Sequence, residues 1–273
     1  MTRVDDAGRG RSPEEERGGR PTVLDLFRLD DKVAIVTGAS SGLGVAFAQA
    51  FAEAGADVVL GARRVEKMAQ TAALVEQAGG RTYTRKTDVA DPEQCRQLVE
   101  AAMAEFGRVD ILINNAGVGT AVPSSRETPE EFRAVIDVNL SGAYWMAQAC
   151  GRVMGPGSAI VNIASVLGLT TAGLPQAAYS ASKAGVMGLT RDLAQQWSGR
   201  KGIRVNALAP GFFASEMTDE LRPGYLESLL PRIIQGRLGD SAELAATAVW
   251  LASPAAGYVT GQTIVVDGGM TIA

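Results

Sequence analysis

Short runs of β-branched and other apolar residues recur along the chain, and longer Ala-rich segments with helical periodicity separate them. VAIVT (33–37), for example, precedes GVAFAQAFAEAG, and ADVVLGA (56–62) precedes EKMAQTAALVEQAGG. This alternation predicts right-handed βαβ units, and therefore a parallel sheet with helices on both faces. The strands that the pattern predicts are residues 33–37, 56–62, 81–88, 109–115, 157–165, 203–210 and 263–267.

The repetition of this unit predicts a single domain of the doubly wound α/β class, with a seven-stranded, mostly parallel sheet. We expect the domain to span residues 23–273, because no change of composition divides that range. Residues 212–239 break the rhythm near the end of a predicted strand. A long insertion at such a place is usually a lid or binding loop, so we interpret this stretch as the substrate loop.

Residues 1–22 lack any such pattern. They combine five arginines with five acidic residues and four glycines, and they contain no apolar run. A segment of this kind cannot bury enough apolar surface to offset the entropy lost on ordering. We expect a disordered N-terminal tail, and the missing apolar run also excludes a secretory signal.

Overall composition narrows the class of partner. Apolar residues make up 46% of the chain and charged residues 21%, with a formal net charge of −4. This balance gives no reason to expect nucleic acid or an anionic membrane surface as a partner. Cys95 and Cys150 lie far apart and form neither a disulfide framework nor a metal-ligand spacing, so we expect no metal and a cytoplasmic location.

A glycine-rich loop, TGASSGLG (Thr37 to Gly44), follows the first predicted strand and opens the first helix. Glycines here permit a tight turn and a close approach of the backbone to a phosphate, which the helix N-terminus attracts. The spacing GxxxGxG is not the common GxGxxG fingerprint, and glycines could simply let the helix pack on the strand. Its position in a βαβ unit favours a dinucleotide site.

The residues at the end of the second strand predict which dinucleotide binds. NAD-binding proteins usually place an acidic residue there to accept hydrogen bonds from the ribose hydroxyls, but this chain has Gly61-Ala62 followed by Arg63 and Arg64. A guanidinium can bind a 2′-phosphate that a carboxylate would repel. We therefore expect NADP(H) to be favoured over NAD(H). The alternative, a solvated helix start, applies more to Arg64 than to Arg63.

The stretch YSASKAG (179–185) supplies candidate acid–base chemistry in a chain that has no histidine. Tyr179 and Lys183 are four residues apart, so both lie on one face of a helix. A free tyrosine has a pKa of about 10, and a nearby ammonium favours the phenolate. We expect Lys183 to lower the pKa of Tyr179 and make it a usable general acid and base.

These motifs together resemble the short-chain dehydrogenase/reductase family. The resemblance rests on TGASSGLG, on Asn114-Asn115-Ala116-Gly117 after the fourth strand, and then on Ser165, Tyr179 and Lys183. It covers about residues 30 to 270 and implies a Rossmann-like fold, NAD or NADP, and hydride transfer between nicotinamide and a carbonyl or alcohol carbon.

The resemblance also implies roles for single residues. Tyr179 would be the proton donor, and Ser165 would hydrogen-bond the reacting oxygen. Lys183 would also contact the nicotinamide ribose, and Asn139 would hold a water linked to Lys183. Together with the loop and arginine arguments above, the expected cofactor-binding residues are Gly38, Ser40, Ser41, Gly42, Leu43, Gly44, Arg63, Arg64, Asp88, Val89, Asn115, Ala116, Gly117, Tyr179, Lys183, Pro210, Gly211, Phe213 and Ser215.

Some of these assignments have alternatives. Asp88 could instead cap the helix that begins near Pro92, and Asn114 could serve only to steady the central sheet. A relative without catalysis, which binds a nucleotide and a partner, would normally lose the tyrosine or the lysine, and this chain keeps both. A dehydratase or epimerase on the same fold is a further alternative.

The substrate contacts are expected at Ser165, Leu167, Tyr179, Phe212 and Met217. Other candidates for the pocket are Val166, Leu174, Gln176, Leu221 and Tyr225. Most of these side chains are apolar, which favours an uncharged carbonyl compound, although several could be ordinary lid packing.

A sugar-acid substrate is the alternative. The opening LFRLDDKVAIVTGAS is similar to gluconate-type dehydrogenases, and Arg222 and Arg232 in the substrate loop could pair with an acid. Finally, GQTIVVDGGM near the C-terminus resembles the family's last strand, which implies a homotetramer or homodimer.

Overall fold

The computed structural model describes residues 22–213 and 224–273. Its centre is one seven-stranded sheet in the order β3-β2-β1-β4-β5-β6-β7, and every neighbouring pair is parallel. The doubly wound α/β fold is therefore confirmed. The strands are β1 (Val33–Thr37), β2 (Asp57–Ala62), β3 (Thr82–Lys86), β4 (Ile111–Asn114), β5 (Ala159–Ile163), β6 (Arg204–Pro210) and β7 (Thr263–Val266).

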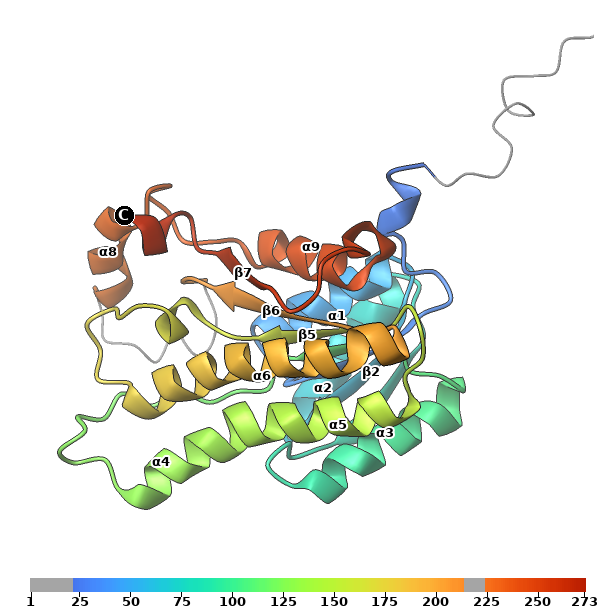
Figure 1. Ribbon diagram of the computed structural model, residues 1–273, viewed down its shortest axis with the longest axis horizontal. Helices are drawn as coiled ribbons and strands as arrows, with labels where there is room; N and C mark the ends of the chain where they lie inside the picture. Colours follow the sequence, from blue (N-terminus) through green and yellow to red (C-terminus); the bar gives the residue numbers. More distant parts are fainter. Residues whose placement is uncertain (1–21, 214–223) are drawn as a thin grey trace, which may run out of the picture.

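Helices connect these strands and cover both faces of the sheet. α1, α2 and α9 pack on one face, while α3, α5 and α6 pack on the other. Figure 1 shows α9 and α1 above the sheet and α6, α5 and α3 below it. The helices are α1 (Leu43–Glu53), α2 (Val65–Gln77), α3 (Pro92–Phe106), α4 (Pro129–Ile136), α5 (Gly142–Val153), α6 (Ala177–Lys201), α8 (Tyr225–Leu229) and α9 (Ser241–Ala252).

The period of two along each strand divides the core into two halves. In β1, Ala34 and Val36 contact the first helical layer, and Val33 and Ile35 contact the second. All five residues of β1 are buried. The central strands are therefore apolar at successive positions, as a sheet covered on both faces requires.

Short turns complete the chain, and two of them matter for the site. η2 (Asp137–Ser141), a wide π turn, joins α4 to α5 without a break, and such turns often occur at functional sites. η3 (Val166–Gly168) follows β5 and packs on α6. The others are η1 (Asp25–Phe27), η4 (Leu230–Arg232), η5 (Pro254–Ala256) and η6 (Met270–Ile272).

Parallel strands bring their carboxyl ends to one edge of the sheet, and that edge is where a doubly wound fold binds its ligand. The arrowheads of β6 and β7 point to the left in Figure 1, toward α8 and the C-terminus. The stretch expected to form the substrate loop contains α8 and η4, while its residues 214–223 lie outside the described part of the chain. The predicted tail, residues 1–22, also lies outside it except for Thr22.

Candidate active site

The glycine loop joins β1 to α1 and forms one end of the site. Gly38 and Gly42 have φ of 67° and 55°, a conformation that favours glycine. A Cβ on Gly38 would lie 2.8 Å from the Ala116 Cα, so the loop passes close to the end of β4. A Cβ on Gly44 would lie 2.3 Å from the Gly38 carbonyl oxygen. Gly44 therefore packs behind the loop and does not line the cavity.

The loop is held by the segment that follows β4. The Thr37 hydroxyl accepts hydrogen bonds from the N–H groups of Asn115 (3.0 Å) and Ala116 (3.1 Å). The Asn115 amide donates to the Thr37 carbonyl at 3.0 Å. Asn114 has a different task, because its amide donates to the Ala143 carbonyl and to Asn162 Oδ1, each at 2.9 Å. Asn114 thus steadies the central sheet, as one interpretation of the sequence had it.

Arg64 lies across the glycine loop. Its guanidinium donates to Ser40 Oγ (3.3 and 3.2 Å) and to Ser41 Oγ (2.6 Å). Arg64 is the exposed N-cap residue of α2, and its guanidinium contacts the glycine loop from there. Both arginines line the cavity with the two serines. A Cβ on Gly61 would lie 2.5 Å from Leu98 Cδ2, so an acidic side chain at this position of β2 would have to displace the Leu98 side chain.

Asp88 and Val89 line the same cavity beyond the end of β3. The alternative in which Asp88 caps the next helix is wrong, because the N-cap of α3 is Asp91. The Asp91 carboxylate accepts hydrogen bonds from the N–H groups of Glu93 and Gln94.

At the inner end of the site, four polar residues come from three segments. Ser165 follows β5, Tyr179 and Lys183 lie on α6, and Asn139 lies in the π turn η2. The Lys183 ammonium donates to the Ile163 carbonyl at 2.7 Å, and its Nζ lies 5.6 Å from the centre of the Tyr179 ring. The structure thus brings the tyrosine, the lysine and the serine together at the carboxyl end of β5.

Asn139 is buried behind these groups and does not line the cavity. Its amide donates to the Val118 carbonyl (2.9 Å) and to Ser182 Oγ (3.0 Å), and its oxygen accepts from the Val118 N–H (2.8 Å). The Ser182 hydroxyl in turn donates to the Tyr179 carbonyl at 2.7 Å. Asn139 is therefore tied to the first turns of α6 through Ser182, a residue that the sequence did not single out.

Burial controls the charges at this end of the site. It lowers the pKa of Lys183 to about 8. Burial also raises the pKa of the Tyr179 phenol, and a hydrogen bond with Ser165 acts in the opposite direction. The net shift of the Tyr179 pKa is therefore upward, whereas the sequence led us to expect a lowered pKa. The reason is that removing a phenolate from water disfavours the charged form.

The substrate half of the cavity is mostly apolar. Val166 and Leu167 of η3 belong to the apolar cluster against which Phe212 packs, and with Leu174 and Gln176 they line the cavity near Tyr179. Tyr225, which the sequence named as a pocket candidate, is buried in lid packing, and its hydroxyl donates to the Ala172 carbonyl at 2.7 Å. The remaining candidates Ser215, Met217, Leu221 and Arg222 lie outside the described residues.

These two ends belong to one cavity of about 470 Å³. Some cavity residues were not predicted from the sequence, although each lies at or near the end of a strand or on the π turn. Their position after a predicted strand or in that turn is the sequence feature that could have identified them. These residues are Thr87, Val118, Gly119, Val138, Ile163 and Ala164.

A doubly wound sheet with a glycine loop at its first turn, and a tyrosine, a lysine and a serine at the end of β5, defines a dinucleotide-dependent oxidoreductase. Comparison with known proteins supports this class. The family described as enoyl-(acyl carrier protein) reductase matches residues 38–271. The chain belongs to the short-chain dehydrogenase/reductase family, as its motifs predicted.

Individual relatives span nearly the whole chain. The chain is 40% identical over 249 residues to the 3-oxoacyl-(acyl-carrier-protein) reductase FabG of Thermotoga maritima, covering 90% of this chain and 100% of the relative. It is 41% identical over 252 residues to 2-dehydro-3-deoxy-D-gluconate 5-dehydrogenase of Dickeya dadantii, with coverage of 90% and 98%.

A solved structure, the gluconate 5-dehydrogenase of Burkholderia cenocepacia J2315 in complex with NADP and tartrate, aligns with a TM-score of 0.85 at 37% identity. The alignment covers 92% of this chain and 100% of that one. The prediction of an oxidoreductase is confirmed by these relatives. Within the described residues, no helix has both the length and the apolar character needed to span a bilayer.

Proposed function

We propose that the protein is an NADP(H)-preferring reductase of uncharged, largely apolar carbonyl compounds, with Tyr179 as its general acid. The observation that carries this proposal is the arrangement at the end of β5. There a buried ammonium (Lys183), a phenol (Tyr179) and a hydroxyl (Ser165) face one cavity, whose other end carries Arg64 and two loop serines.

The residues present fit a dinucleotide. The first turn of α1 offers backbone N–H groups and the positive end of the helix dipole for the phosphates. Asp88 and Val89 would contact the adenine, and Lys183 the nicotinamide ribose. Pro210, Gly211 and Phe213, at and just beyond the end of β6, line the cavity and would contact the nicotinamide end. When bound, the nicotinamide supplies the hydride that reduces the carbonyl carbon.

The protein's own residues would handle the proton. Burial raises the pKa of Tyr179, so the phenol is protonated at neutral pH and ready to donate to the carbonyl oxygen. Ser165 would hydrogen-bond the same oxygen and hold it beside the phenol. Donation leaves a phenolate close to the Lys183 ammonium, and an opposite charge nearby favours that charged form. Asn139 and Ser182 would keep the start of α6 in place.

Preference for NADP(H) is supported by the donors that gather over the glycine loop. Ser40 and Ser41 both accept hydrogen bonds from Arg64, so each hydroxyl directs its own proton elsewhere. Guanidinium and hydroxyl donors together suit a phosphate. The end of β2 carries no carboxylate that would repel it, since Ala62 lines the cavity there.

The substrate proposal rests on the described part of the pocket. Its wall beside Tyr179 includes the apolar side chains of Val166, Leu167, Leu174 and Phe212, together with the polar side chain of Gln176. The sequence offered Arg232 as a partner for a sugar acid. In the structure its guanidinium donates a hydrogen bond to the Thr171 carbonyl at 3.0 Å. A sugar-acid substrate remains the second candidate, because relatives of this chain are named as gluconate-type dehydrogenases.

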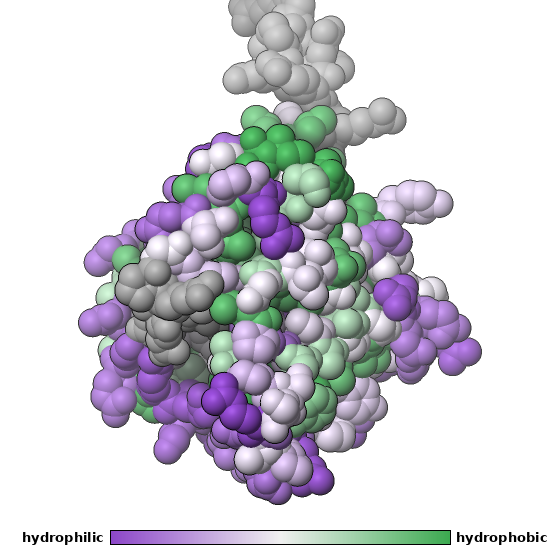
Figure 2. Space-filling view, turned by 90° about the vertical axis from the view of Figure 1, so that its left-hand side faces the viewer, coloured by the Kyte–Doolittle hydropathy of each residue, from purple (hydrophilic) through white to green (hydrophobic). Residues whose placement is uncertain are grey.

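We also propose self-association and a cytoplasmic location. Among the described strands β7 pairs only with β6, and none of its four residues is buried. Val265 of β7 and Ile272 of η6 are exposed apolar residues on this C-terminal segment. In the view of Figure 2, which faces the ligand-binding end of the sheet, hydrophobic residues gather toward the upper edge. Cys95 and Cys150 are buried free thiols, which suits a reducing compartment.

Replacement of Tyr179 by Phe should remove the proton donor without removing the cofactor contacts. We expect Tyr179→Phe to lose at least about a hundredfold in kcat, the usual size of general acid catalysis. The dissociation constant of NADPH should stay within a factor of about two. Turnover is followed by NADPH absorbance on the best substrate from a panel of apolar ketones, sugar acids and acyl thioesters. Near-normal turnover by this variant would overturn the mechanism.

Removal of the guanidinium over the glycine loop should weaken NADPH selectively. A charged hydrogen bond is worth about 1.5–3 kcal/mol, so Arg64→Ala should raise the dissociation constant of NADPH at least about tenfold. Binding of NADH should change little, and Arg63→Ala should show a smaller effect of the same kind. Arg133→Ala, which removes an exposed arginine on α4, is the control. Equal kcat/KM for NADH and NADPH in the unchanged enzyme would contradict the preference.

Light scattering at micromolar concentration tests the assembly. We expect the mass of a homodimer or homotetramer. Val265→Lys, a charge on the exposed edge strand, should shift that mass toward the monomer. A monomeric mass for the unchanged protein would rule out the proposed self-association.

A further inference from the structure

The turn that joins β3 to α3 is held from within by hydrogen bonds. Thr87, Asp88 and Val89 of this turn line the cavity. The Ala90 N–H donates to Asp88 Oδ1 at 3.1 Å, and the Asp91 N–H donates to the Asp88 carbonyl at 3.1 Å. The backbone at Asp88 is therefore folded into a tight turn whose own carboxylate fastens it.

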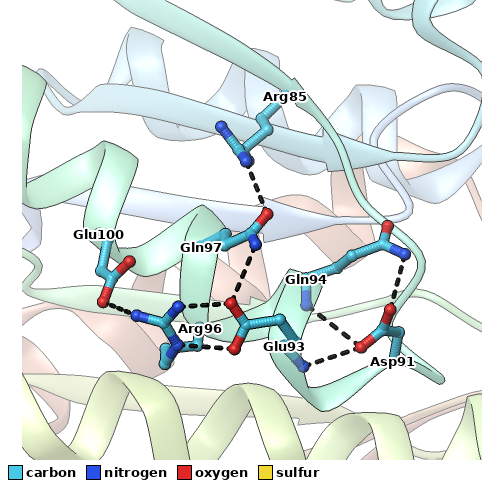
Figure 3. A network of polar contacts seen from close by, with 7 residues as sticks. All are labelled: Arg85, Asp91, Glu93, Gln94, Arg96, Gln97 and Glu100. Carbon is cyan, nitrogen blue, oxygen red and sulfur yellow. Dashed lines mark hydrogen bonds and ion pairs between the residues drawn. The ribbon is translucent and has the colours of Figure 1, made fainter.

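Gln94, on the first turn of α3, fastens the same turn from outside. Its Oε1 accepts a hydrogen bond from the Asp88 N–H at 2.9 Å, and its Nε2 donates to Asp91 Oδ2 at 2.9 Å. Figure 3 shows Gln94 reaching Asp91 at the start of the helix. The orientation of the amide is fixed chemically, because an N–H must meet its oxygen and a carboxylate must meet its nitrogen.

One carboxylate oxygen of Asp88 remains available as a hydrogen-bond acceptor. Its Oδ1 is taken by the Ala90 N–H, whereas its Oδ2 accepts no hydrogen bond from any residue in the described ranges. Val89 beside it is buried, and a Cβ on Gly142 would lie 2.7 Å from Val89 Cγ2. The cavity wall here combines one fixed carboxylate oxygen with one apolar side chain. This combination fits the edge of a flat base that carries an N–H donor.

The sheet order indicates that the adenine of a bound NADP(H) would lie over this wall. Its phosphates would bind at the start of α1, and the ribose phosphate would bind at Arg64, after β2. The neighbouring strand on that side is β3, so the base would lie over its end, at Asp88 and Val89. Adenine presents an amino donor, whereas hypoxanthine presents a carbonyl acceptor at the same atom and would be repelled by a carboxylate.

We propose that Gln94 is the positioning residue that lets Asp88 select adenine in NADP(H). This inference rests on the proposed function and adds a residue that never touches the cofactor. Without the Gln94 amide, the Asp88 N–H and one Asp91 oxygen lose their partners, and the turn can relax toward water. The carboxylate then no longer meets the amino group in a fixed position, and selectivity falls.

The test compares NADPH with its hypoxanthine analogue, deamino-NADPH, in fluorescence titrations of the full-length protein. We expect the unchanged protein to bind NADPH at least about tenfold more tightly than the analogue, as one charged hydrogen bond implies. Gln94→Met has a similar length but no hydrogen-bonding group. It should lose most of this ratio, by weakening NADPH far more than deamino-NADPH.

Gln97→Met is the matched control. Gln97 lies one turn further along α3 in the same polar network, where it bonds Arg85 and Glu93 and does not touch the turn (Figure 3). Both dissociation constants should stay unchanged in this variant. A general loss of helix stability would affect the two variants alike, so it would not produce the difference between them.

Asp88→Asn tests the same idea if Gln94→Met does not fold. An amide in place of the carboxylate can donate a hydrogen bond to hypoxanthine, so the preference should fall or invert. Full selectivity retained by Gln94→Met would overturn the proposal. If the unchanged protein binds both dinucleotides equally but still prefers NADPH to NADH, the adenine assignment fails while the proposed function stands.

Discussion

The hydrogen bond from the Lys183 ammonium to the Ile163 carbonyl holds the proposed catalytic groups of α6 at the end of β5. α6 is a 25-residue helix, and this contact, near its start, joins it to the carboxyl end of β5. Lys183 is only 4% exposed, and no carboxylate within the described ranges pairs with it. Burying an ammonium with a carbonyl as its partner is costly, which is why burial lowers its pKa to about 8.

The free-energy cost of burying the Lys183 ammonium is explained if its charge acts on Tyr179 during the proposed reaction. The same burial raises the pKa of Tyr179, so the two groups are held in the protonation states that suit donation of a proton from the phenol. A phenolate formed there would meet the ammonium that is already in place. Preorganised charge of this kind is worth more than charge recruited from solvent, because no reorganisation is needed during the reaction.

The order of the strands separates recognition from chemistry. Successive strands are added on one side of β1 up to β3 and on its other side from β4 onward. The glycine loop lies at the point where this strand order reverses. On one side, the ends of β2 and β3 carry Arg64 and Asp88. On the other side, the ends of β5 and β6 carry Ser165 and Phe213. Substitutions at the ends of β2 and β3 can therefore change cofactor binding without moving Tyr179, the proposed proton donor.

Period-two and helical patterns predicted the seven strands, because each depends on residues that are near one another in the chain. The predicted strand VAIVT coincides with β1 at both ends. Each of the other predicted strands is longer than the observed strand by one to four residues. The candidate residues Ser165, Tyr179 and Lys183 could also be named, since their spacing and motif are local.

Long-range contacts could not be predicted in this way. The bonds from Arg64 to Ser40 and Ser41 join residues more than 20 positions apart, and no local pattern predicts them. The pKa of Tyr179 depends on how deeply the folded chain buries it, and Gln94 has no motif at all. Packing after folding decides each of these features.

Spectroscopic titration of Tyr179 tests the central claim most directly. Tyrosinate absorbance is followed against pH in the unchanged protein and in Lys183→Met, and Tyr179→Phe is subtracted in each background to isolate this phenol. Burial predicts a pKa above the ordinary value of about 10 for the unchanged protein. The Lys183 amine, with a pKa of about 8, has already lost its charge at that pH, so Lys183→Met should leave the tyrosine pKa nearly unchanged. A pKa at or below about 10 for the unchanged protein would contradict the claim that burial keeps the phenol protonated until a carbonyl oxygen accepts its proton.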